Sequence, residues 1–388
     1  MAIRKICILG LDDYPMLTGD PSLGHIGGES VQHVLLARAW RDLGLDVSII
    51  VHDHGQAHIT MVDGIRAVSA FPRAAGIRVL RFVHPRLTSV LSAMRELDAD
   101  VYYQSPAAPW TGVVAYFAKR FDKHSIFRVA SDSDCVRGRQ RVSSSKGVAR
   151  SHRDRWMYEY GLTNVSLVAA QTVHQRSLLA QHFAIKSEIL NIAVELPRTT
   201  APDPKDIDVL WVGNFREVKR PDVAVELARR LPQYRFAFVG GSVPGGDSYY
   251  QRIATEAKRL SNVTFAGPVA YEQTGKWFDR ARLHVNTSDY EGFPNTFLQA
   301  WVRRVPVVSF YDPDTVIRRH GLGRVCTGLD EMQMQIDTLL KNRDACAEAG
   351  GRGYAYAASE FSAHSIATRY LELLDPVSMR SQRLAAVG

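Results

Sequence analysis

The chain has 388 residues, which is long for one domain and suits two domains that each bury a core of their own. Its composition, with 46% hydrophobic and 23% charged residues, is typical of a soluble globular protein, and no uncharged apolar run is long enough to predict a membrane-spanning helix. The net charge of +8 favours anionic partners, whereas four scattered cysteines exclude a disulfide framework and favour a reducing, cytoplasmic setting.

The first half of the sequence alternates short apolar runs with longer amphipathic stretches. KICILG (5–10) ends in a glycine, as a buried parallel strand often does, and we interpret it as the first strand and not as part of a secretion signal. Residues 29–44 place apolar side chains on one helical face, and Gly44 is suited to end that helix. This alternation predicts an open, mostly parallel sheet. Further strands are expected at 46–54, 98–106, 125–134 and 166–172, and helices near 110–120 and 173–183.

A second α/β half follows PRTTAPDPKD (197–206), a segment rich in proline and charge that lacks periodicity and is the best candidate for a linker. Pro221 is suited to the first turn of a helix over 219–231. Strands are expected at 208–214, 234–241, 263–269, 282–288 and 305–310. We therefore predict two α/β domains with a cleft between them. Their bounds are 1–196 for the N-terminal domain, 197–206 for the linker, 207–361 for the C-terminal domain, 362–375 for a final amphipathic helix and 376–388 for a frayed tail.

Two loops lie where open α/β sheets bind ligands, which is at the carboxyl end of a strand and before the N-terminus of a helix. Gly27 and Gly28 precede the first long helix and would allow a phosphate or sugar to approach the backbone, although a tight turn explains two glycines equally well. Arg216 and Lys219 follow the strand that ends at Gly213. Two cations there would neutralise a diphosphate whose charge grows as its bond to a sugar breaks, unless they are simply solvated surface cations.

A third loop, Glu291-Gly292-Phe293-Pro294, forms the corner between a strand and a helix that begins near Asn295. The backbone amides of Asn295–Phe297 would be orphan donors of the first helical turn and would bind a dianion without a metal. Glu291 would accept hydrogen bonds from sugar hydroxyls, and Gln299 would reach a ribose. The alternatives are an acid favoured by the helix dipole and a core amide whose hydrogen bonds are satisfied. The combination of these residues favours the site.

A basic stretch covers residues 136–155, where seven arginines and lysines face one acid, Asp154. Such a stretch attracts polyanions, anionic lipid head groups or phosphorylated substrates, unless it is a solvated loop with no partner. Nucleic acid is a less suitable partner, because no aromatic residues are interleaved as a stacking platform. The arginines that we assign to an acceptor or membrane patch are Arg137, Arg139, Arg141 and Arg150.

The sequence D-Y-E-G-F-P-N-T-F-L-Q-A (289–300), followed by V-P-V-V-S (305–309), resembles the signature of the retaining GT-B glycosyltransferases of family four, also called group 1. The likeness extends to residues 212–231 and 27–50 and covers nearly the whole chain in the right order. It implies an α/β GT-B fold, in which two Rossmann-like doubly wound domains face each other across a cleft and the final helix packs back on the N-terminal domain. It also implies transfer from a nucleotide-sugar donor to an acceptor on the N-terminal domain, with retained anomeric configuration and without a metal or cofactor.

The family's functional positions can be carried over onto this sequence. Glu291 resembles the acid that contacts the donor sugar, and Lys219 resembles the lysine that binds the diphosphate. Gly27 and Gly28 resemble the N-terminal loop over that diphosphate. The remaining donor-binding residues that the resemblance implies are Gly213, Asn214, Gly292, Phe293, Pro294, Asn295, Thr296 and Gln299.

The chain departs from the family pattern at three places. Gln299 stands where the family often has a second glutamate, so it supplies no charge. Asn214 stands where an arginine is usual, and Arg216 is expected to act in its place. The family's His-Asp pair is replaced by the segment ASDSD (130–134), where Ser131 or Asp132 would have to substitute for the histidine unless its role is dispensed with. The catalytic candidates are therefore Glu291, Lys219, Arg216 and Asp132.

Two patterns resemble metal sites. Asp132-Ser133-Asp134 matches the D-x-D that holds Mn²⁺ or Mg²⁺ in the other large glycosyltransferase fold, but that fold is a single domain. His52-Asp53-His54 places two imidazoles on one face of a strand without a third ligand at a fitting spacing. We expect no metal site.

The sequence thus predicts a retaining glycosyltransferase that moves a sugar from a UDP- or GDP-linked donor to a saccharide or lipid-linked acceptor in bacterial surface polysaccharide biosynthesis. We expect it in the cytoplasm, at the inner face of the plasma membrane if the basic stretch binds lipid. The alternative is a catalytically weak or inactive GT-B-like scaffold that binds nucleotide or membrane. A dinucleotide-dependent oxidoreductase would need G-x-G-x-x-G after the first strand, which LGLDDYPMLTG (9–19) lacks. The sequence does not specify the donor base, the sugar, the acceptor, the linkage or the oligomeric state.

Overall fold

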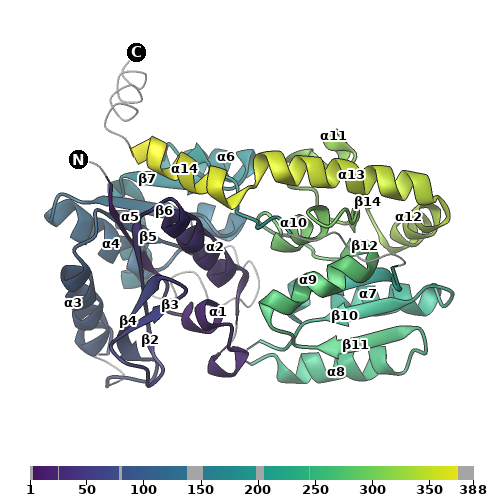
Figure 1. Ribbon diagram of the computed structural model, residues 1–388, viewed down its shortest axis with the longest axis horizontal. Helices are drawn as coiled ribbons and strands as arrows, with labels where there is room; N and C mark the ends of the chain where they lie inside the picture. The colour runs from purple at the N-terminus through teal and green to yellow at the C-terminus, as the bar shows by residue number, and fades with distance from the viewer. Residues whose placement is uncertain are drawn as a thin grey trace, which may run out of the picture. The chain divides into compact units, whose positions relative to one another are not determined.

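The computed structural model describes residues 3–24, 26–77, 81–137, 152–197, 205–243 and 245–374. The chain forms two compact units, one made of Met1–Ala193 with Ala363–Gly388 and the other of Val194–Ser362. Each unit is built on one sheet with helices packed on it, which confirms the expected Rossmann-like α/β architecture (Figure 1). Residues 198–204 of the expected linker and the expected tail at 376–388 lie outside the described residues. No helix in the described part of the chain combines the length and the apolar character that crossing a bilayer requires.

The N-terminal unit contains an eight-stranded sheet in the order β3-β4-β2-β1-β5-β6-β7-β8. All neighbouring strands pair in parallel except β3 and β4, so the expectation of a mostly parallel sheet holds. The central strands are buried on both faces, as parallel strands covered by helices must be. The strands are β1 (Lys5–Leu9), β2 (Asp46–Asp53), β3 (Ile59–Val62), β4 (Ile65–Pro72), β5 (Val101–Gln104), β6 (His124–Arg128), β7 (Leu167–Ala170) and β8 (Glu188–Ile189).

The hairpin of β3 and β4 is a feature that our sequence reasoning overlooked. Its turn is made by Asp63 and Gly64, which both have positive φ angles of 51° and 72°. This is the backbone of the tight turn that suits the twist of a hairpin, and Asp-Gly is its preferred sequence. The dipeptide between two alternating apolar runs was therefore a usable signal for an antiparallel edge strand.

The helices of the N-terminal unit include one from the far end of the chain. The indole Nε1 of Trp40 in α2 donates to the carbonyl of Ala367 at 3.1 Å, and its ring meets Tyr370 edge-on at 5.8 Å. Burial of these aromatic rings fixes α14 beside α2 (Figure 1). The helices are α1 (Tyr14–Thr18), α2 (Gly28–Asp42), α3 (Thr88–Leu97), α4 (Pro109–Arg120), α5 (His152–Asn164), α6 (Val173–Phe183) and α14 (Ala363–Leu374), with short turns η1 (Pro21–Leu23), η2 (Phe82–Leu87) and η3 (Asp132–Cys135).

The C-terminal unit contains a six-stranded sheet, entirely parallel, in the order β11-β10-β9-β12-β13-β14. Its strands are β9 (Ile207–Val212), β10 (Phe236–Val239), β11 (Val263–Gly267), β12 (Ala281–Asn286), β13 (Val307–Ser309) and β14 (Gly323–Val325). Its helices are α7 (Pro221–Arg230), α8 (Asp247–Lys258), α9 (Tyr271–Arg280), α10 (Asn295–Trp301), α11 (Val316–His320), α12 (Leu329–Lys341) and α13 (Arg343–Glu360), with short turns η4 (Glu217–Lys219) and η5 (Pro313–Thr315).

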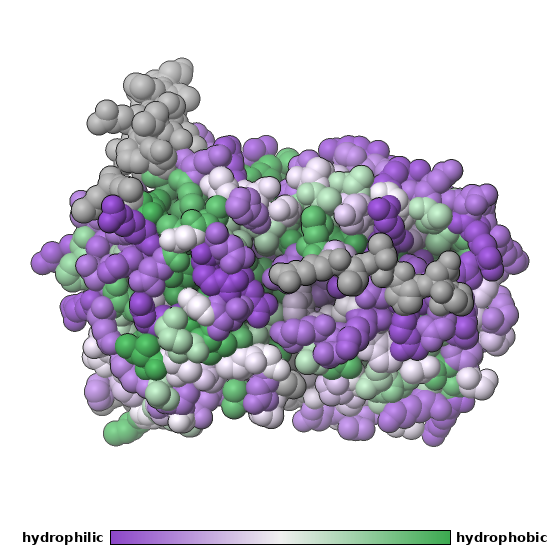
Figure 2. All heavy atoms as spheres, viewed as in Figure 1, coloured by the Kyte–Doolittle hydropathy of each residue, from purple (hydrophilic) through white to green (hydrophobic). Residues whose placement is uncertain are grey.

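Helix α13 contains glycines that our sequence reasoning did not connect with a helix. A Cβ at Gly350 would lie 2.2 Å from the carbonyl oxygen of Arg304, and a Cβ at Gly353 would lie 2.7 Å from the Trp301 ring. These glycines therefore let α13 pack closely against α10, at the cost of lower intrinsic helix propensity. The visible outer face of α12 and α13 is mostly hydrophilic (Figure 2).

Candidate functional site

The C-terminal sheet reverses its direction of growth between β9 and β12. From β9 the chain adds β10 and β11 on one side, and then returns to add β12 on the other side of β9, with Val209 opposite Leu283 and Leu210 opposite His284. In open α/β sheets, ligands bind at the carboxyl ends of the strands at such a point. The two loops at this point contain Lys219 and Glu291.

The loop after β9 is held by Phe215. Its side chain is fully buried, its ring packs against Trp211 at 4.9 Å and Tyr250 at 5.1 Å, and its N–H donates to the carbonyl of Gly241 at 3.0 Å. Phe215 is fixed in the core, and the short segment after it forms the turn η4 directly before α7 begins. Arg216 lies exposed at the start of that turn, and Lys219 ends it.

Thr287 connects the two loops. This buried side chain lies at hydrogen-bond distance from the carbonyl oxygens of Lys219 and Arg220, at 2.7 and 2.8 Å, and it accepts a hydrogen bond from Trp211 Nε1 at 3.1 Å. The N–H of Asp289 also donates to the carbonyl of Val218 at 3.0 Å. The backbone at Lys219 is therefore fixed by the end of β12. Our sequence reasoning missed Thr287, although a hydroxyl at the end of a buried strand was a visible signal.

Glu291 and Lys219 form an ion pair. Glu291 also accepts a hydrogen bond from Ser288 Oγ at 2.6 Å, and Asn286 Nδ2 lies at 3.5 Å. The two charged side chains are 11% and 28% exposed, so they are shielded but reachable. Because Glu291 has neutral donors besides the ammonium group, Lys219 can turn to an incoming anion without leaving the carboxylate unpaired.

Helix α10 follows this carboxylate directly. The buried Phe293, which packs on Phe361 at 4.9 Å, and the buried Pro294 fix the corner before it. The residues expected on its inner side, Phe297, Leu298, Trp301, Val302 and Val305, are all buried. One expectation is wrong: the amide of Phe297 is not an orphan donor, because it donates to the carbonyl of Pro294 at 3.0 Å. Asn295 and Thr296, which are half-buried, supply the first two amides of the helix.

Gln299 does not point to a free surface. Its side chain is 8% exposed and shares a hydrogen bond with Tyr271, whose pKa is raised by burial. The structure therefore favours the alternative that we left open, a core amide with a partner inside the protein, over a residue that reaches a ribose. The sequence could not show this, because Tyr271 comes from α9.

Other expected site residues belong to the N-terminal unit. Gly27 is the N-cap of α2 and Gly28 is its first residue. Asp132 accepts a hydrogen bond from Gln175 Nε2 at 3.1 Å. The carboxylate of Asp134 instead accepts from the backbone N–H groups of Ala130 and Ser131, and burial raises its pKa to about 6. The two acids of the D-x-D pattern thus have separate partners, and Asp134 serves a capping box at the start of η3.

The basic stretch is described only at its ends. Arg137 pairs with Glu159 at 3.4 Å and lies over the ring of Phe183 at 5.1 Å. Arg139, Arg141 and Arg150 lie outside the described residues.

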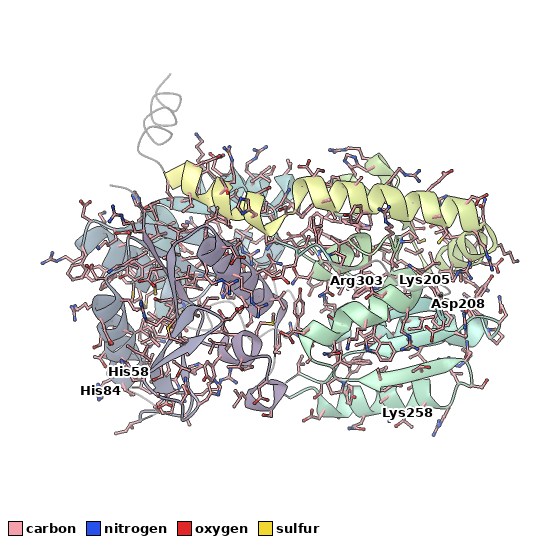
Figure 3. The ribbon with its side chains drawn as sticks, in the orientation of Figure 1. His58, His84, Lys205, Asp208, Lys258 and Arg303 are labelled. Carbon is pink, nitrogen blue, oxygen red and sulfur yellow. The ribbon has the colours of Figure 1, made fainter. Side chains whose placement is uncertain are left out.

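A second cluster of charge in the C-terminal unit is structural. Asp208, labelled in Figure 3, lies at the amino end of β9 and pairs with Arg235 at 3.0 Å and Arg282 at 3.2 Å. Although burial opposes it, hydrogen bonds from these arginines lower the pKa of Asp208. Since ligands gather at the other end of parallel strands, this cluster is not part of the candidate site.

Comparisons with solved structures identify the fold. The chain superposes on sucrose-phosphate synthase from Thermosynechococcus elongatus with a TM-score of 0.75 and 16% identity, covering 99% of this chain and 100% of that one. It superposes on HepE of Anabaena, solved in complex with UDP-glucose, with a TM-score of 0.70 and 15% identity, covering 95% and 99% of the two chains. The fold is therefore that of the GT-B glycosyltransferases.

Residues 206–342 match the family model described as glycosyl transferases group 1. Over this segment of the C-terminal unit, the chain is similar to the group 1 glycosyltransferases. A further relative is the Vi polysaccharide biosynthesis protein VipC/TviE of Salmonella typhi, which is 31% identical over 111 residues, or 27% of this chain. The match spans 18% of the length of that relative.

Proposed function

We propose that this protein is a retaining glycosyltransferase that takes a sugar from a nucleoside-diphosphate donor and gives it to a saccharide or lipid-linked acceptor. The observation that supports it best is the pairing of Lys219 and Glu291 at the switch point of the C-terminal sheet. The family match over residues 206–342 and the UDP and UDP-glucose complexes of HepE support a nucleotide-sugar donor, and we propose UDP or GDP as its nucleotide. The name of the Vi polysaccharide relative supports a role in bacterial surface polysaccharide biosynthesis.

In this proposal, Lys219 leaves Glu291 and binds the diphosphate, together with the first amides of α10. Glu291 stays with Ser288 and accepts hydrogen bonds from hydroxyls of the donor sugar. Charge then accumulates on the diphosphate as the bond from the sugar C1 to the phosphate oxygen breaks, and the fixed ammonium group and amides stabilise it in place of a metal ion. Arg216, exposed on the same turn, can add a second positive charge when the diphosphate is bound.

We propose that retention arises by attack on the face from which the nucleotide leaves. The acceptor oxygen forms its bond to C1 on that face, and its proton passes to the departing phosphate oxygen. We assign no covalent intermediate to Glu291, because in this proposal its carboxylate stays with Ser288 and binds hydroxyls of the donor sugar. We propose that Asp132 of the N-terminal unit positions the acceptor.

The experiment is a transfer assay preceded by a thermal-shift screen of UDP, GDP and ADP. One nucleotide is expected to raise the melting temperature, because it binds only the folded chain, and the corresponding nucleotide sugar is expected to give a product with the donor's anomeric configuration by NMR. An inverted product would contradict retention. A nucleotide that binds without transfer or hydrolysis would instead support the inactive scaffold, which the enclosed Gln299 favours.

We further propose that α5 faces an anionic membrane surface. Trp156 is 67% exposed and stacks on Tyr160 at 5.9 Å, while Arg153, one turn earlier, lies 4.0 Å from the centre of the Phe82 ring. An exposed tryptophan that follows two arginines, Arg153 and Arg155, suits a helix that lies at a lipid interface. The expected result is flotation with phosphatidylglycerol vesicles that is lost at high salt and reduced in Trp156→Ala. Met334→Ala, which removes an exposed side chain of α12, is the control. Equal flotation with neutral vesicles would contradict the proposal.

A further inference from the structure

The N-terminal sheet has a switch point of its own, between β1 and β5. From β1 the chain adds β2 and β4 on one side and then returns to add β5 on the other side of β1. Helix α2 begins beside this point, and Glu29 lies in its first turn. Ser105 follows β5, and its hydroxyl donates to Glu29. Open α/β sheets bind ligands at such switch points, so Glu29 lies at the position where this unit is expected to bind a ligand.

Glu29 is held by a buried cation. Arg128, at the end of β6, is 2% exposed, and its Nη2 donates to Glu29 Oε1 at 2.8 Å. Its Nε donates to the hydroxyl of Tyr103 at 2.7 Å, so the guanidinium group cannot turn freely. Glu29 itself is 23% exposed. The carboxylate of Glu29, which is accessible to solvent, is thus oriented by Arg128, which is buried.

The surroundings of Glu29 suit hydroxyl groups better than phosphate. His33 Nε2 lies 3.7 Å from Glu29 Oε1, and His33 Nδ1 lies 2.6 Å from the buried Asp13. The carboxylates of Glu29 and Asp13 therefore flank the His33 ring, while Arg128 is already paired with Glu29, and this local charge disfavours an anion. Arg128 Nη1 and His33 Nε2 have no hydrogen-bond partner among the described residues, which is uncommon for buried polar atoms.

Burying an arginine is costly, and its ion pair with a carboxylate rarely repays that cost in stability. A ligand site explains the arrangement, since carboxylates that bind substrate are oriented by a second layer of hydrogen bonds. We propose that Glu29 accepts hydrogen bonds from hydroxyls of an uncharged sugar ring of the acceptor, and that Arg128 is its positioning residue. This inference rests on the proposed glycosyltransferase function and assigns the acceptor side of it.

The test is saturation-transfer NMR with the methyl glycosides of glucose, galactose, mannose and N-acetylglucosamine. The intact protein is expected to bind at least one of them, and Glu29→Gln and Glu29→Asp are each expected to bind it at least about 10-fold more weakly. The second variant keeps the charge beside Arg128 and therefore guards against a loss of folding. Glu96→Gln, which changes a carboxylate paired with His58 on the surface of the same unit, is the matched control (His58 is labelled in Figure 3).

Arg128→Lys keeps the positive charge but loses the fixed geometry of the guanidinium group. It is expected to weaken glycoside binding, and to add little further loss when combined with Glu29→Asp, because both changes act on one carboxylate. The thermal shift by the nucleotide is expected to be unchanged in all these variants. Unchanged glycoside binding in both Glu29 variants, or no glycoside binding by the intact protein, would overturn the inference. If the nucleotide still raises the melting temperature, the proposed function survives the loss of this inference. If the intact protein binds neither the nucleotide nor a glycoside, the proposed function and this inference both fail.

Discussion

Lys219→Ala is expected to lower the rate of sugar transfer by about 10²–10³-fold, the usual cost of removing one fixed donor from a developing negative charge. The side chain is 28% exposed, and the backbone around it is fixed by Thr287, so the turn that contains it does not depend on the ammonium group. Glu291 retains its hydrogen bond from Ser288 in this variant. Steady-state kinetics with the nucleotide sugar found in the thermal-shift screen measures the effect.

Lys341→Ala is the matched control for this variant. It removes another lysine of the C-terminal unit that pairs with an acid, Asp337 at 2.7 Å, but it lies on the exposed side of α12. Its turnover is expected to equal that of the unchanged protein, since exposed pairs contribute little. If Lys219→Ala turned over substrate as fast as this control, with the same melting temperature, the assignment of the diphosphate site would be wrong.

Glu291→Gln is expected to lower kcat/KM by about 10–10²-fold, because a hydrogen bond from a sugar hydroxyl to a charged group is worth about 1.5–3 kcal/mol. Glutamine keeps the shape of the side chain and can still accept from Ser288 Oγ. Binding of the nucleotide alone is expected to change little, since the lost contact is to the sugar. Kinetics and thermal shift measured on the same preparation separate the two effects.

Glu331→Gln is a suitable control for Glu291→Gln. Glu331 accepts hydrogen bonds from the N–H and the hydroxyl of Thr327 at 2.7 and 2.8 Å, so it is another hydrogen-bonded carboxylate close to the start of a helix. It is expected to leave kcat/KM unchanged. A Glu291→Gln enzyme that lost affinity for the bare nucleotide but kept its sugar-dependent kinetics would contradict the role given to Glu291.

Much of the fold followed from local patterns in the sequence. Apolar runs that end in glycine, such as KICILG, predicted strands of parallel sheets, and the helix face made of Phe297, Leu298 and Trp301 is buried as expected. The β3–β4 hairpin was not predicted, because the short antiparallel strand β3 interrupts the strand–helix alternation and only the Asp63-Gly64 turn marks it. Helix α13 was missed because glycine lowers helix propensity, and the close contacts that require it involve α10 and the loop after it.

The candidate site was less accessible to sequence reasoning wherever partners are distant in the chain. The spacing of residues around Gln299 could not reveal that Tyr271 satisfies its amide, and no local pattern links Glu29 to Arg128, 99 residues later. The loops that contain Lys219 and Glu291 could be placed at strand ends from the sequence. Their meeting depends on β9 and β12 being neighbours, which only the sheet order shows.

The central claim is that a nucleoside diphosphate lies between the turn after β9 and the first turn of α10. A crystal structure of the protein with the nucleotide selected by the thermal-shift screen tests it most directly. We expect phosphate oxygens within hydrogen-bond distance of Lys219 Nζ and of the first amides of α10, with the Lys219–Glu291 pair opened. A nucleotide bound elsewhere, with that pair still closed and side chains filling the space above it, would contradict the account.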